Sequence, residues 1–344
     1  MESTEHGPSE HPPQQPLPGL PAPPPLGASA LPPGTYAGRT VLVTGGGTGL
    51  GKAIAAEFAR LGAHLVIVGR RAGQLQQAVA ELGEIAAGAE AAGGAAGGAD
   101  AGRADDCRAD AGGADAGRAD AGAGRITAAV CDIRDPERIA EVFDAAVAAS
   151  GLPDVLVNNA AANFPVPAED MSPNAWRAVV DVTLTGTWLT TREFGRRHLA
   201  AGTPGSILNI GASYAWTGGP GFAHSAAAKA GVKSLTETLA VEWGPYGIQV
   251  NGLVPGLVPH SDMTADIRAG LARDEGPAAL RQPALRVGLP RELGWAATFL
   301  ASPYASFITG HTLVVDGANW QRRSLVNPEV TPLREQLGRG PFSP

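Results

Sequence analysis

Short runs of apolar residues recur along residues 39–320 and alternate with longer segments that mix apolar and polar positions. Short runs with few polar positions predict strands that are buried on both faces of a sheet. These runs lie at Thr40–Thr44, His64–Val68, Ile126–Val130, Val155–Val157, Ser206–Ile210, Gln249–Leu253 and Thr312–Val315. The pattern therefore predicts seven strands.

The segments between these strands carry apolar residues at every third or fourth position, which is the spacing of an amphipathic helix. They span Lys52–Leu61, about Ala72–Ala87, Pro136–Ser150, Pro173–Ala200 and Ser225–Trp243. Strands joined by helices of this length pair in parallel, and the helices then cover both faces of the sheet. We therefore predict an α/β fold, a single Rossmann-type doubly wound domain with a seven-stranded parallel sheet, over residues 35–320.

Two segments lack this alternation and are expected to be disordered. Residues 1–34 are rich in proline, and no Lys or Arg precedes Arg39. This leader has neither the basic start of a secretory signal nor the arginines of a mitochondrial transit peptide, so we expect a cytoplasmic protein. Residues 88–124 are almost entirely Ala, Gly, Asp and Arg, a composition that cannot bury enough apolar surface to fold. Residues 321–344 are interpreted as a C-terminal tail.

Composition and charge exclude several classes of partner. The net charge of −7 gives no reason to expect nucleic-acid binding. No apolar run reaches the length of a membrane span. The two cysteines, Cys107 and Cys131, provide neither a disulfide framework nor the spacing of a metal site.

A glycine-rich loop follows the first predicted strand and reads TGGGTGLG over Thr44–Gly51. Glycines at this point let the backbone approach a pyrophosphate, and the next helix supplies N–H donors. A P-loop is the competing interpretation, but Ala53 stands where its Mg²⁺-binding hydroxyl belongs, so a dinucleotide site is favoured. Its candidate residues are Gly45, Thr48, Gly49, Leu50 and Gly51.

Two arginines at the end of the second strand indicate which dinucleotide is bound. An acidic residue about 20 positions beyond the glycines would bind the ribose of NAD. Arg70 and Arg71 stand there instead, and a guanidinium can hold a 2′-phosphate through two hydrogen bonds. The sequence therefore predicts NADP(H) as the cofactor.

The segment Tyr214–Lys229 contains the most informative chemistry of the chain. Many nicotinamide reductases keep a Tyr-x-x-x-Lys pair at the start of an apolar helix, but here Ser225 stands four residues before Lys229. An aliphatic alcohol cannot match a phenol as a proton donor near neutral pH. Because Tyr214 lies upstream, across a glycine-rich turn, the donor is interpreted as relocated rather than absent.

These motifs resemble the short-chain dehydrogenase/reductase family over about residues 38–319, without the insertion. Within that family the chain looks most like the 2,4-dienoyl-CoA reductases. The residues that carry this likeness are TGGGTGLGK (44–52), CDIRDP (131–136), NNAAANF (158–164), SPNAW (172–176) and the Tyr214…Ser225-x-x-x-Lys229 arrangement. One departure is Thr183, which stands where the family usually has asparagine.

The resemblance implies a role for individual residues. Asp132 and Ile133 would contact the adenine, Asn158 and Ala160 would line the nicotinamide channel, Lys229 would hold the nicotinamide ribose, and Pro255 and Gly256 would complete the cofactor site. Tyr214 and Asn163 would bind the thioester carbonyl with the support of Ser225. Arg134, Phe164 and Ser172 would contact the acyl-CoA.

Three functions stay open from the sequence. The first is NADPH-dependent reduction of a carbon–carbon double bond in an unsaturated acyl-CoA, in which charge collects on the distant thioester oxygen. The second is reduction of ketones with Tyr214 in an unusual pose, and the third is nucleotide binding with little turnover. The long helices predicted at 173–200 and 225–243 are rich in small and apolar residues, so we also expect a homodimer or homotetramer.

Overall fold

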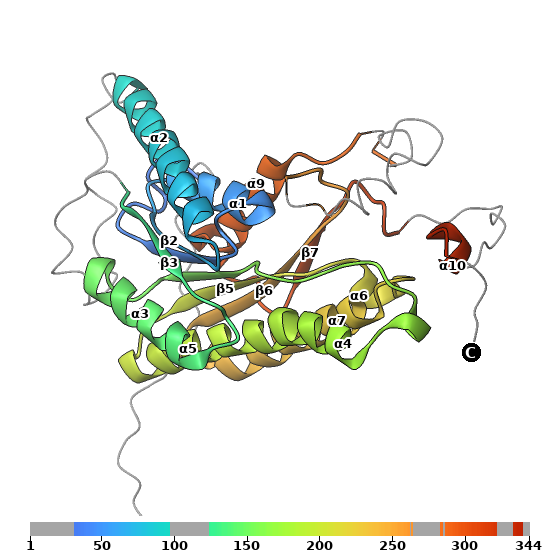
Figure 1. Ribbon diagram of the computed structural model, residues 1–344. Coiled ribbons are helices and arrows are strands. Elements are labelled where there is room, and N and C mark those ends of the chain that lie inside the picture. The colour runs from blue at the N-terminus through green and yellow to red at the C-terminus, as the bar shows by residue number, and fades with distance from the viewer. Residues whose placement is uncertain are drawn as a thin grey trace, which may run out of the picture.

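The computed structural model describes residues 31–96, 124–261, 263, 283–284, 286–321 and 333–339 (Figure 1). Seven strands form one sheet in the order β3-β2-β1-β4-β5-β6-β7, and every pairing is parallel. The strands are β1 (Thr40–Thr44), β2 (His64–Gly69), β3 (Ile126–Val130), β4 (Val155–Asn158), β5 (Gly205–Ile210), β6 (Ile248–Pro255) and β7 (Thr312–Val315). The predicted fold class and all seven predicted strands are confirmed.

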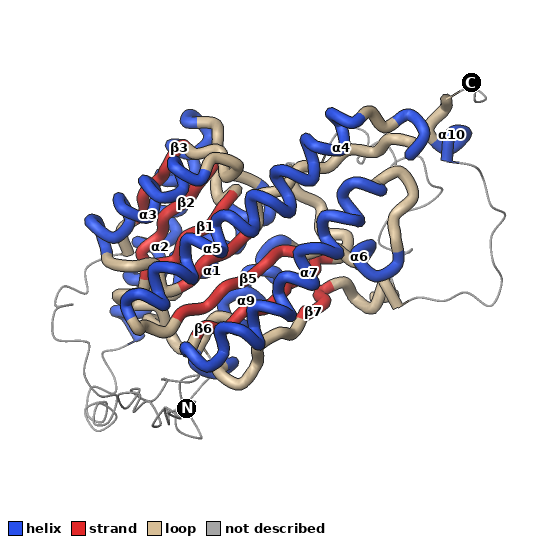
Figure 2. The backbone as a smooth tube through the Cα atoms, turned by 90° about the horizontal axis from the view of Figure 1, so that it is seen from below, coloured by secondary structure: helices blue, strands red, loops and turns tan. Residues whose placement is uncertain are grey.

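Helices cover both faces of this sheet (Figures 1 and 2). One face carries α1 (Gly49–Arg60), α2 (Ala72–Ala96) and α9 (Pro290–Leu300), and the other carries α3 (Pro136–Ser150), α5 (Gly186–Ala201) and α7 (Ala223–Trp243). The shorter helices are η3 (Ala168–Asp170), α4 (Pro173–Val180), η4 (Asp181–Thr185), α6 (Tyr214–Thr217), η5 (Gly244–Tyr246), η7 (Pro303–Ala305) and α10 (Leu333–Gln336).

Each face of the sheet has its own hydrophobic core. Ile54 and Phe58 of α1 are fully buried against strand residues such as Ile67. On the opposite face, Phe143 of α3 and Phe194 of α5 are equally buried. Burying one such side chain contributes roughly 1.5–3 kcal/mol, so these two layers hold the helices on the sheet.

The strand order reverses between β1 and β4, and this topology determines where a ligand binds. In open α/β sheets the crevice lies beyond the carboxyl ends of the strands, at the point where the order reverses. The glycine-rich loop follows β1, and Asn159 follows β4. Both segments therefore meet at the expected crevice.

Two predicted helices differ from those observed. Helix α2 continues to Ala96 instead of ending near Ala87, because the alanine-rich start of the insertion has high helix propensity. The predicted helix Pro173–Ala200 contains a π-helical turn, η4, between α4 and α5. The remaining disorder predictions, for residues 1–30 and 97–123, lie outside the described residues.

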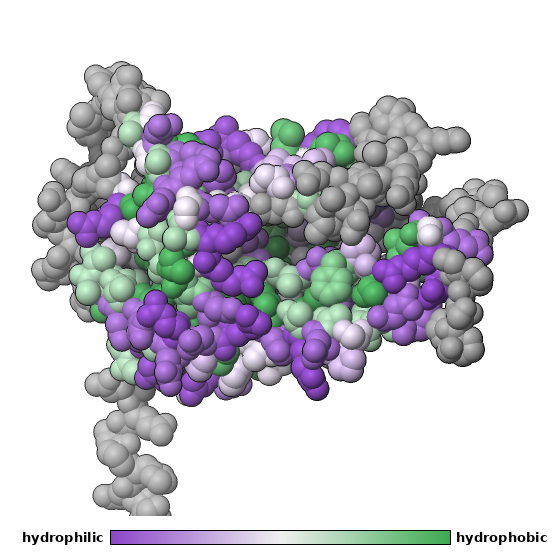
Figure 3. Space-filling model, in the orientation of Figure 1, coloured by the Kyte–Doolittle hydropathy of each residue, from purple (hydrophilic) through white to green (hydrophobic). Residues whose placement is uncertain are grey.

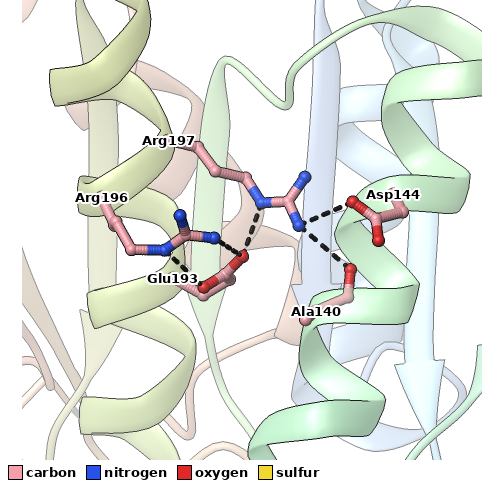
Figure 4. Close-up of polar contacts among 5 residues, drawn as sticks. All are labelled: Ala140, Asp144, Glu193, Arg196 and Arg197. Carbon is pink, nitrogen blue, oxygen red and sulfur yellow. Dashed lines mark hydrogen bonds and ion pairs between the residues drawn. The ribbon is translucent and has the colours of Figure 1, made fainter.

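Ion pairs and hydrogen bonds hold α5 against α3 (Figure 4). Glu193 accepts hydrogen bonds from Arg196 and Arg197, and Arg197 also donates to Asp144 and to the Ala140 carbonyl. Burial raises the pKa of Glu193, but the two arginines outweigh it and hold that pKa below its usual value. These interactions are structural and hold α5 against α3.

The face of the molecule seen in Figure 1 has both polar and apolar regions. Figure 3 shows apolar residues gathered along the middle of the face seen in Figure 1, with polar residues above and below them. Among the helices of the described ranges, none is long and apolar enough to cross a membrane.

Candidate active site

The glycine-rich loop is packed too closely for side chains. Gly45 has a φ of +65°, and a Cβ there would lie 2.7 Å from Asn159 Nδ2. A Cβ on Gly51 would lie 2.3 Å from the Gly45 carbonyl oxygen. Thr48 precedes α1, so Gly49, Leu50 and Gly51 form the first helical turn, whose N–H groups point out of the helix. The loop can therefore hold an anionic group against its backbone.

Asn159 fastens this loop to the end of β4. Its Nδ2 donates to the carbonyl oxygens of Thr44 at 3.1 Å and Gly45 at 3.2 Å. The Thr44 hydroxyl in turn accepts from the backbone N–H groups of Asn159 at 3.0 Å and Ala160 at 3.1 Å. Sequence reasoning did not assign Asn159 a role, although the paired asparagines Asn158 and Asn159 marked the position.

The ends of β2 and β3 bring together the residues predicted to contact the adenosine half of a cofactor. Arg70 and Arg71 are exposed, and Arg70 lies close enough to Asp132 to lower its pKa. Arg134 donates to Asp132 at 2.9 and 2.6 Å, and this pairing is the main reason why the Asp132 pKa falls to about 2. Ile133 is buried, and it packs so closely on Gly186 that a Cβ at that glycine would lie 2.6 Å from the Ile133 side chain.

Asn158 is buried in a polar network beneath the crevice. Its Nδ2 donates to Thr191 at 2.8 Å and to Asn209 at 2.9 Å, and its Oδ1 accepts from Thr190 at 2.6 Å. All of its hydrogen-bonding atoms therefore have protein partners. The side chain braces β4 against α5 and β5, and Ala160 is the residue nearer the surface.

The end of β6 forms another side of the crevice. Pro255 is the last residue of the strand, and the Gly256 N–H donates to the Val315 carbonyl at 3.0 Å. A Cβ on Gly256 would lie 2.4 Å from the Asp316 Cβ, so only glycine fits this turn.

Lys229 is buried at the bottom of the site. Its Nζ donates to the Ile210 carbonyl at 2.5 Å, at the carboxyl end of β5. Burial lowers the pKa of Lys229 to about 8. An ammonium has three donors, so this lysine can also hold hydroxyl groups of a ligand.

The residues of the predicted relocated donor site meet in the structure. Tyr214 Oη lies 3.0 Å from Ser225 Oγ, and Asn163 Nδ2 donates to Tyr214 Oη at 3.4 Å. They come from three segments, the loop after β4, the start of α6 and the first turn of α7. Burial raises the pKa of Tyr214 and outweighs the hydrogen bond with Ser225, so the phenol stays protonated near neutral pH. We call Asn163, Tyr214 and Ser225 the donor trio.

Two buried polar atoms at the donor trio have no hydrogen-bond partner among the described residues: Oδ1 of Asn163 itself and Nε2 of the adjacent His224. The Ser225 N–H donates to His224 Nδ1 at 2.8 Å, and the His224 ring meets Phe164 edge to face at 4.8 Å. Buried polar groups nearly always have hydrogen-bond partners, so these two atoms can form hydrogen bonds with a bound ligand or with water. Of the predicted substrate residues, Phe164 is at this position.

The π-helical turn positions the loop that carries Asn163. Thr183 lies within η4 and is fully buried, and its hydroxyl accepts from the Ala162 N–H at 3.2 Å. Such turns inside α-helices occur mostly at functional sites. In the sequence Thr183 stood out only as a departure from the family pattern, and its contact with the backbone next to Asn163 was not predicted.

Two predicted substrate residues serve local structure. Ser172 caps α4, because its hydroxyl accepts from the Ala175 N–H at 3.1 Å. Arg134 is exposed and paired with Asp132. Neither makes a contact with the donor trio.

Comparisons with known proteins match the chain over almost its whole fold. Residues 84–318 match the family model described as Enoyl-(Acyl carrier protein) reductase, and residues 39–108 match the model described as short chain dehydrogenase. A probable 2,4-dienoyl-CoA reductase of Bacillus subtilis is 34% identical over 286 residues, which is 82% of this chain and 96% of that protein. The peroxisomal 2,4-dienoyl-CoA reductase of Rattus norvegicus is 34% identical over 82% of this chain and 84% of its own length.

A solved structure agrees with the fold. It is described as a putative 2-deoxy-D-gluconate 3-dehydrogenase from Agrobacterium tumefaciens with bound NADP. It is 32% identical, with a TM-score of 0.66 over 84% of this chain and 99% of that one. Matches of this extent, on a sheet of this strand order, show that the chain belongs to the short-chain dehydrogenase/reductase family of oxidoreductases.

Proposed function

We propose that the protein is an NADPH-dependent reductase of unsaturated acyl-CoA thioesters, either 2,4-dienoyl-CoA or trans-2-enoyl-CoA. The observation that carries this proposal is the donor trio, in which the Tyr214 hydroxyl is 3.0 Å from Ser225 Oγ and 3.4 Å from Asn163 Nδ2. The phenol thus comes from α6, while a serine stands four residues before Lys229. The names of the Bacillus and Rattus relatives support the same substrate class.

The chemistry of a conjugated thioester fits a donor set of this kind. Bound NADPH would supply a hydride to a carbon at the far end of the conjugated system. The negative charge collects on the thioester oxygen, where the Tyr214 O–H and the Asn163 Nδ2–H would donate hydrogen bonds. Each such donor contributes about 3 kcal/mol to stabilisation of the transition state. Water would supply the proton that completes the reduced carbon skeleton.

The residues of the crevice fit NADPH. Lys229 would hold the nicotinamide ribose, and the backbone N–H groups of the glycine-rich loop would hold the pyrophosphate. Arg70 and Arg71 are exposed, Arg70 lies close enough to Asp132 to lower its pKa, and guanidinium groups there suit a 2′-phosphate. The remaining cofactor contacts proposed are Asp132, Ile133, Ala160, Pro255 and Gly256.

Two features of the protein in the cell also remain proposals. We propose a homodimer or homotetramer, because α5 and α7 expose apolar side chains such as Trp188 and Val241 on their outer surfaces. We also propose a cytoplasmic location, although the Rattus relative is peroxisomal by name.

A substrate panel tests this function. The purified protein is given NADPH or NADH together with 2,4-hexadienoyl-CoA, a trans-2-enoyl-CoA or one of several ketones, and oxidation of the nucleotide is followed. The proposal predicts turnover of a CoA thioester with NADPH, and the two thioesters separate dienoyl from enoyl reduction.

The other outcomes would contradict the proposal. Turnover of ketones alone would mean that Tyr214 acts as an ordinary proton donor to a carbonyl. No turnover, with NADPH still bound, would favour a nucleotide-binding role. Faster turnover with NADH would refute the assignment of Arg70 and Arg71 to a 2′-phosphate.

A further inference from the structure

The C-terminal segment 333–339 lies against the loop that precedes α4, as Figures 1 and 2 both show for α10. This loop, residues 159–172, carries Asn163 and ends in the acidic turn Glu169–Asp170. Arg334 Nη1 donates to Asp170 Oδ1 at 2.9 Å and to Glu169 Oε1 at 3.2 Å. Arg339 Nη1 donates to the other oxygen of Asp170 at 2.7 Å. Two arginines thus hold the two oxygens of one carboxylate.

The segment is built to present both arginines on one side. Helix α10 is closed by Gly338, whose φ is +64°. The Gly338 N–H donates to the Glu335 carbonyl at 3.0 Å, and the Arg339 N–H donates to the Arg334 carbonyl at 2.8 Å. These two bonds form a Schellman motif, which turns the chain back at the end of a helix. The turn brings Arg339 next to Arg334, so both reach Asp170.

Leu333 connects the same segment to a second loop. A Cβ built on Gly221 would lie 3.5 Å from a Leu333 methyl group and 3.9 Å from the Pro165 Cβ. Gly221 follows α6, and Pro165 belongs to the first loop, so Leu333 lies where the two loops meet. The loops are also joined directly, because the Val166 N–H donates to the Gly221 carbonyl at 2.9 Å.

Both loops carry members of the donor trio or their immediate neighbours. Pro165 is two residues from Asn163, and Gly221 is next to Phe222, whose ring is stacked with that of Tyr214 at 6.1 Å. A shift of one loop relative to the other would change the separation of the Asn163 and Tyr214 donors. Misplacement by about 1 Å can cost about 100-fold in rate when reacting groups must be aligned.

We propose that segment 333–339 is a positioning strap, in which Arg334, Arg339 and Leu333 hold the loop that carries Asn163 in register with the loop between α6 and α7. The kinetic part of this proposal rests on the proposed reduction of acyl-CoA thioesters, whereas the structural part does not. The ionised state of Asp170 agrees with it, since Arg334 and then Arg339 keep the pKa of that carboxyl below its usual value.

The strap can be tested in the full-length protein with one charge reversal and one truncation. Arg334→Glu opposes Glu169 and Asp170, and a chain that ends before Leu333 removes the segment. Arg334→Lys keeps the charge, and Arg177→Glu changes the net charge equally at an exposed arginine of α4. The readouts are hydrogen exchange at the Val166 and Phe222 amides, NADPH affinity, and kcat with a dienoyl-CoA.

The strap predicts a distinct pattern across these variants. The Val166 amide is bonded across the two loops to Gly221, and the Phe222 amide is bonded within the second loop to Gly219. Hydrogen exchange at both amides rises by about tenfold in Arg334→Glu and more in the truncated chain, because the loops open more easily. The kcat falls by about tenfold while the NADPH Kd stays within about twofold, because the donors move and the cofactor crevice does not. Arg334→Lys and Arg177→Glu leave all three readouts near those of the unaltered protein.

Two results would separate failure of the strap from failure of the proposed function. Unchanged exchange at Val166 and Phe222 in the truncated chain would overturn the strap, whatever the activity. Raised exchange, in a protein that turns over no thioester in any form, would support the strap as a clamp on the loops and refute the acyl-CoA reaction instead.

Discussion

Burial shifts the pKa values of two single residues at this site, Tyr214 and Lys229. Burial raises the pKa of Tyr214, whereas burial lowers the pKa of Lys229 to about 8. A neutral phenol is a hydrogen-bond donor, which is what a developing negative charge on a thioester oxygen requires. A buried ammonium lowers the stability of the folded protein, and Lys229 lies where its N–H groups can bind a ligand.

The lysine gives a prediction for stability against pH in the cofactor-free protein. The pKa of Lys229 is about 8 in the folded state and 10.5 ordinarily, so between these values the unfolded chain binds more protons. The free energy of unfolding therefore rises with pH in this window on account of Lys229. Urea titrations at several pH values should show Lys229→Met as the more stable protein at pH 7, with the difference shrinking toward pH 10.

A matched control for this prediction is Lys233→Met, one helical turn further along α7. Lys233 is paired with Glu237 and partly exposed, so its removal takes away a lysine from the same helix and leaves the buried Lys229 in place. A difference between Lys229→Met and the unaltered protein that does not vary with pH would contradict the assignment of a lowered pKa.

At the scale of elements, periodicity predicted the sheet well because parallel strands buried on both faces are continuously apolar. The seven strands were predicted from this periodicity, and the glycine motif marked the loop after the first strand. Local patterns could not show the π-helical turn at Thr183 or the clamp made by Asn159, since both depend on contacts between segments far apart in the chain. The short α10 was missed for the same reason, because its pairing with Asp170 spans 164 residues.

The polar network under the crevice yields a prediction about how these elements are tied together. Asn209 of β5 links Asn158 of β4 to Thr236 of α7, with both hydrogen bonds 2.9 Å long. Thr236→Val leaves the buried Asn209 Nδ2 without its acceptor and should lower the free energy of unfolding by about 1–3 kcal/mol. Chemical denaturation measures this, and Thr217→Val, at an exposed threonine, should change it little. An equal change in the free energy of unfolding for the two substitutions would refute the stabilising role of the Asn209–Thr236 hydrogen bond.

In the whole molecule, the cofactor crevice lies where the strand order reverses, between β1 and β4, and the donor trio lies beside it. The helices α5 and α7 lie next to each other on one face, as Figure 2 shows. Trp188 of α5 is 45% exposed and Val241 of α7 is 81% exposed. Contiguous apolar surface commonly marks a site that pairs with another protein, so these two exposed side chains are the positions at which we test for such pairing.

This surface predicts the assembly of the protein. The combined variant Trp188→Glu with Val241→Glu places charge on the proposed interface and should shift a dimer or tetramer toward the monomer, as measured by sedimentation velocity. Val147→Glu, at a 42% exposed valine of α3, is the control and should leave assembly unchanged. A monomeric unaltered protein, or an unchanged oligomer in the combined variant, would contradict the prediction.

The relocation of the donor to Tyr214 is the central claim, and one substitution tests it most directly. Tyr214→Phe removes the hydroxyl, and Tyr246→Phe removes an equivalent hydroxyl at a 40% exposed position. With NADPH and a dienoyl-CoA, kcat should fall by about 100- to 1,000-fold in Tyr214→Phe, while the NADPH Kd and the Tyr246→Phe enzyme stay unchanged. Full turnover by Tyr214→Phe would contradict the account, because the donor would then lie elsewhere.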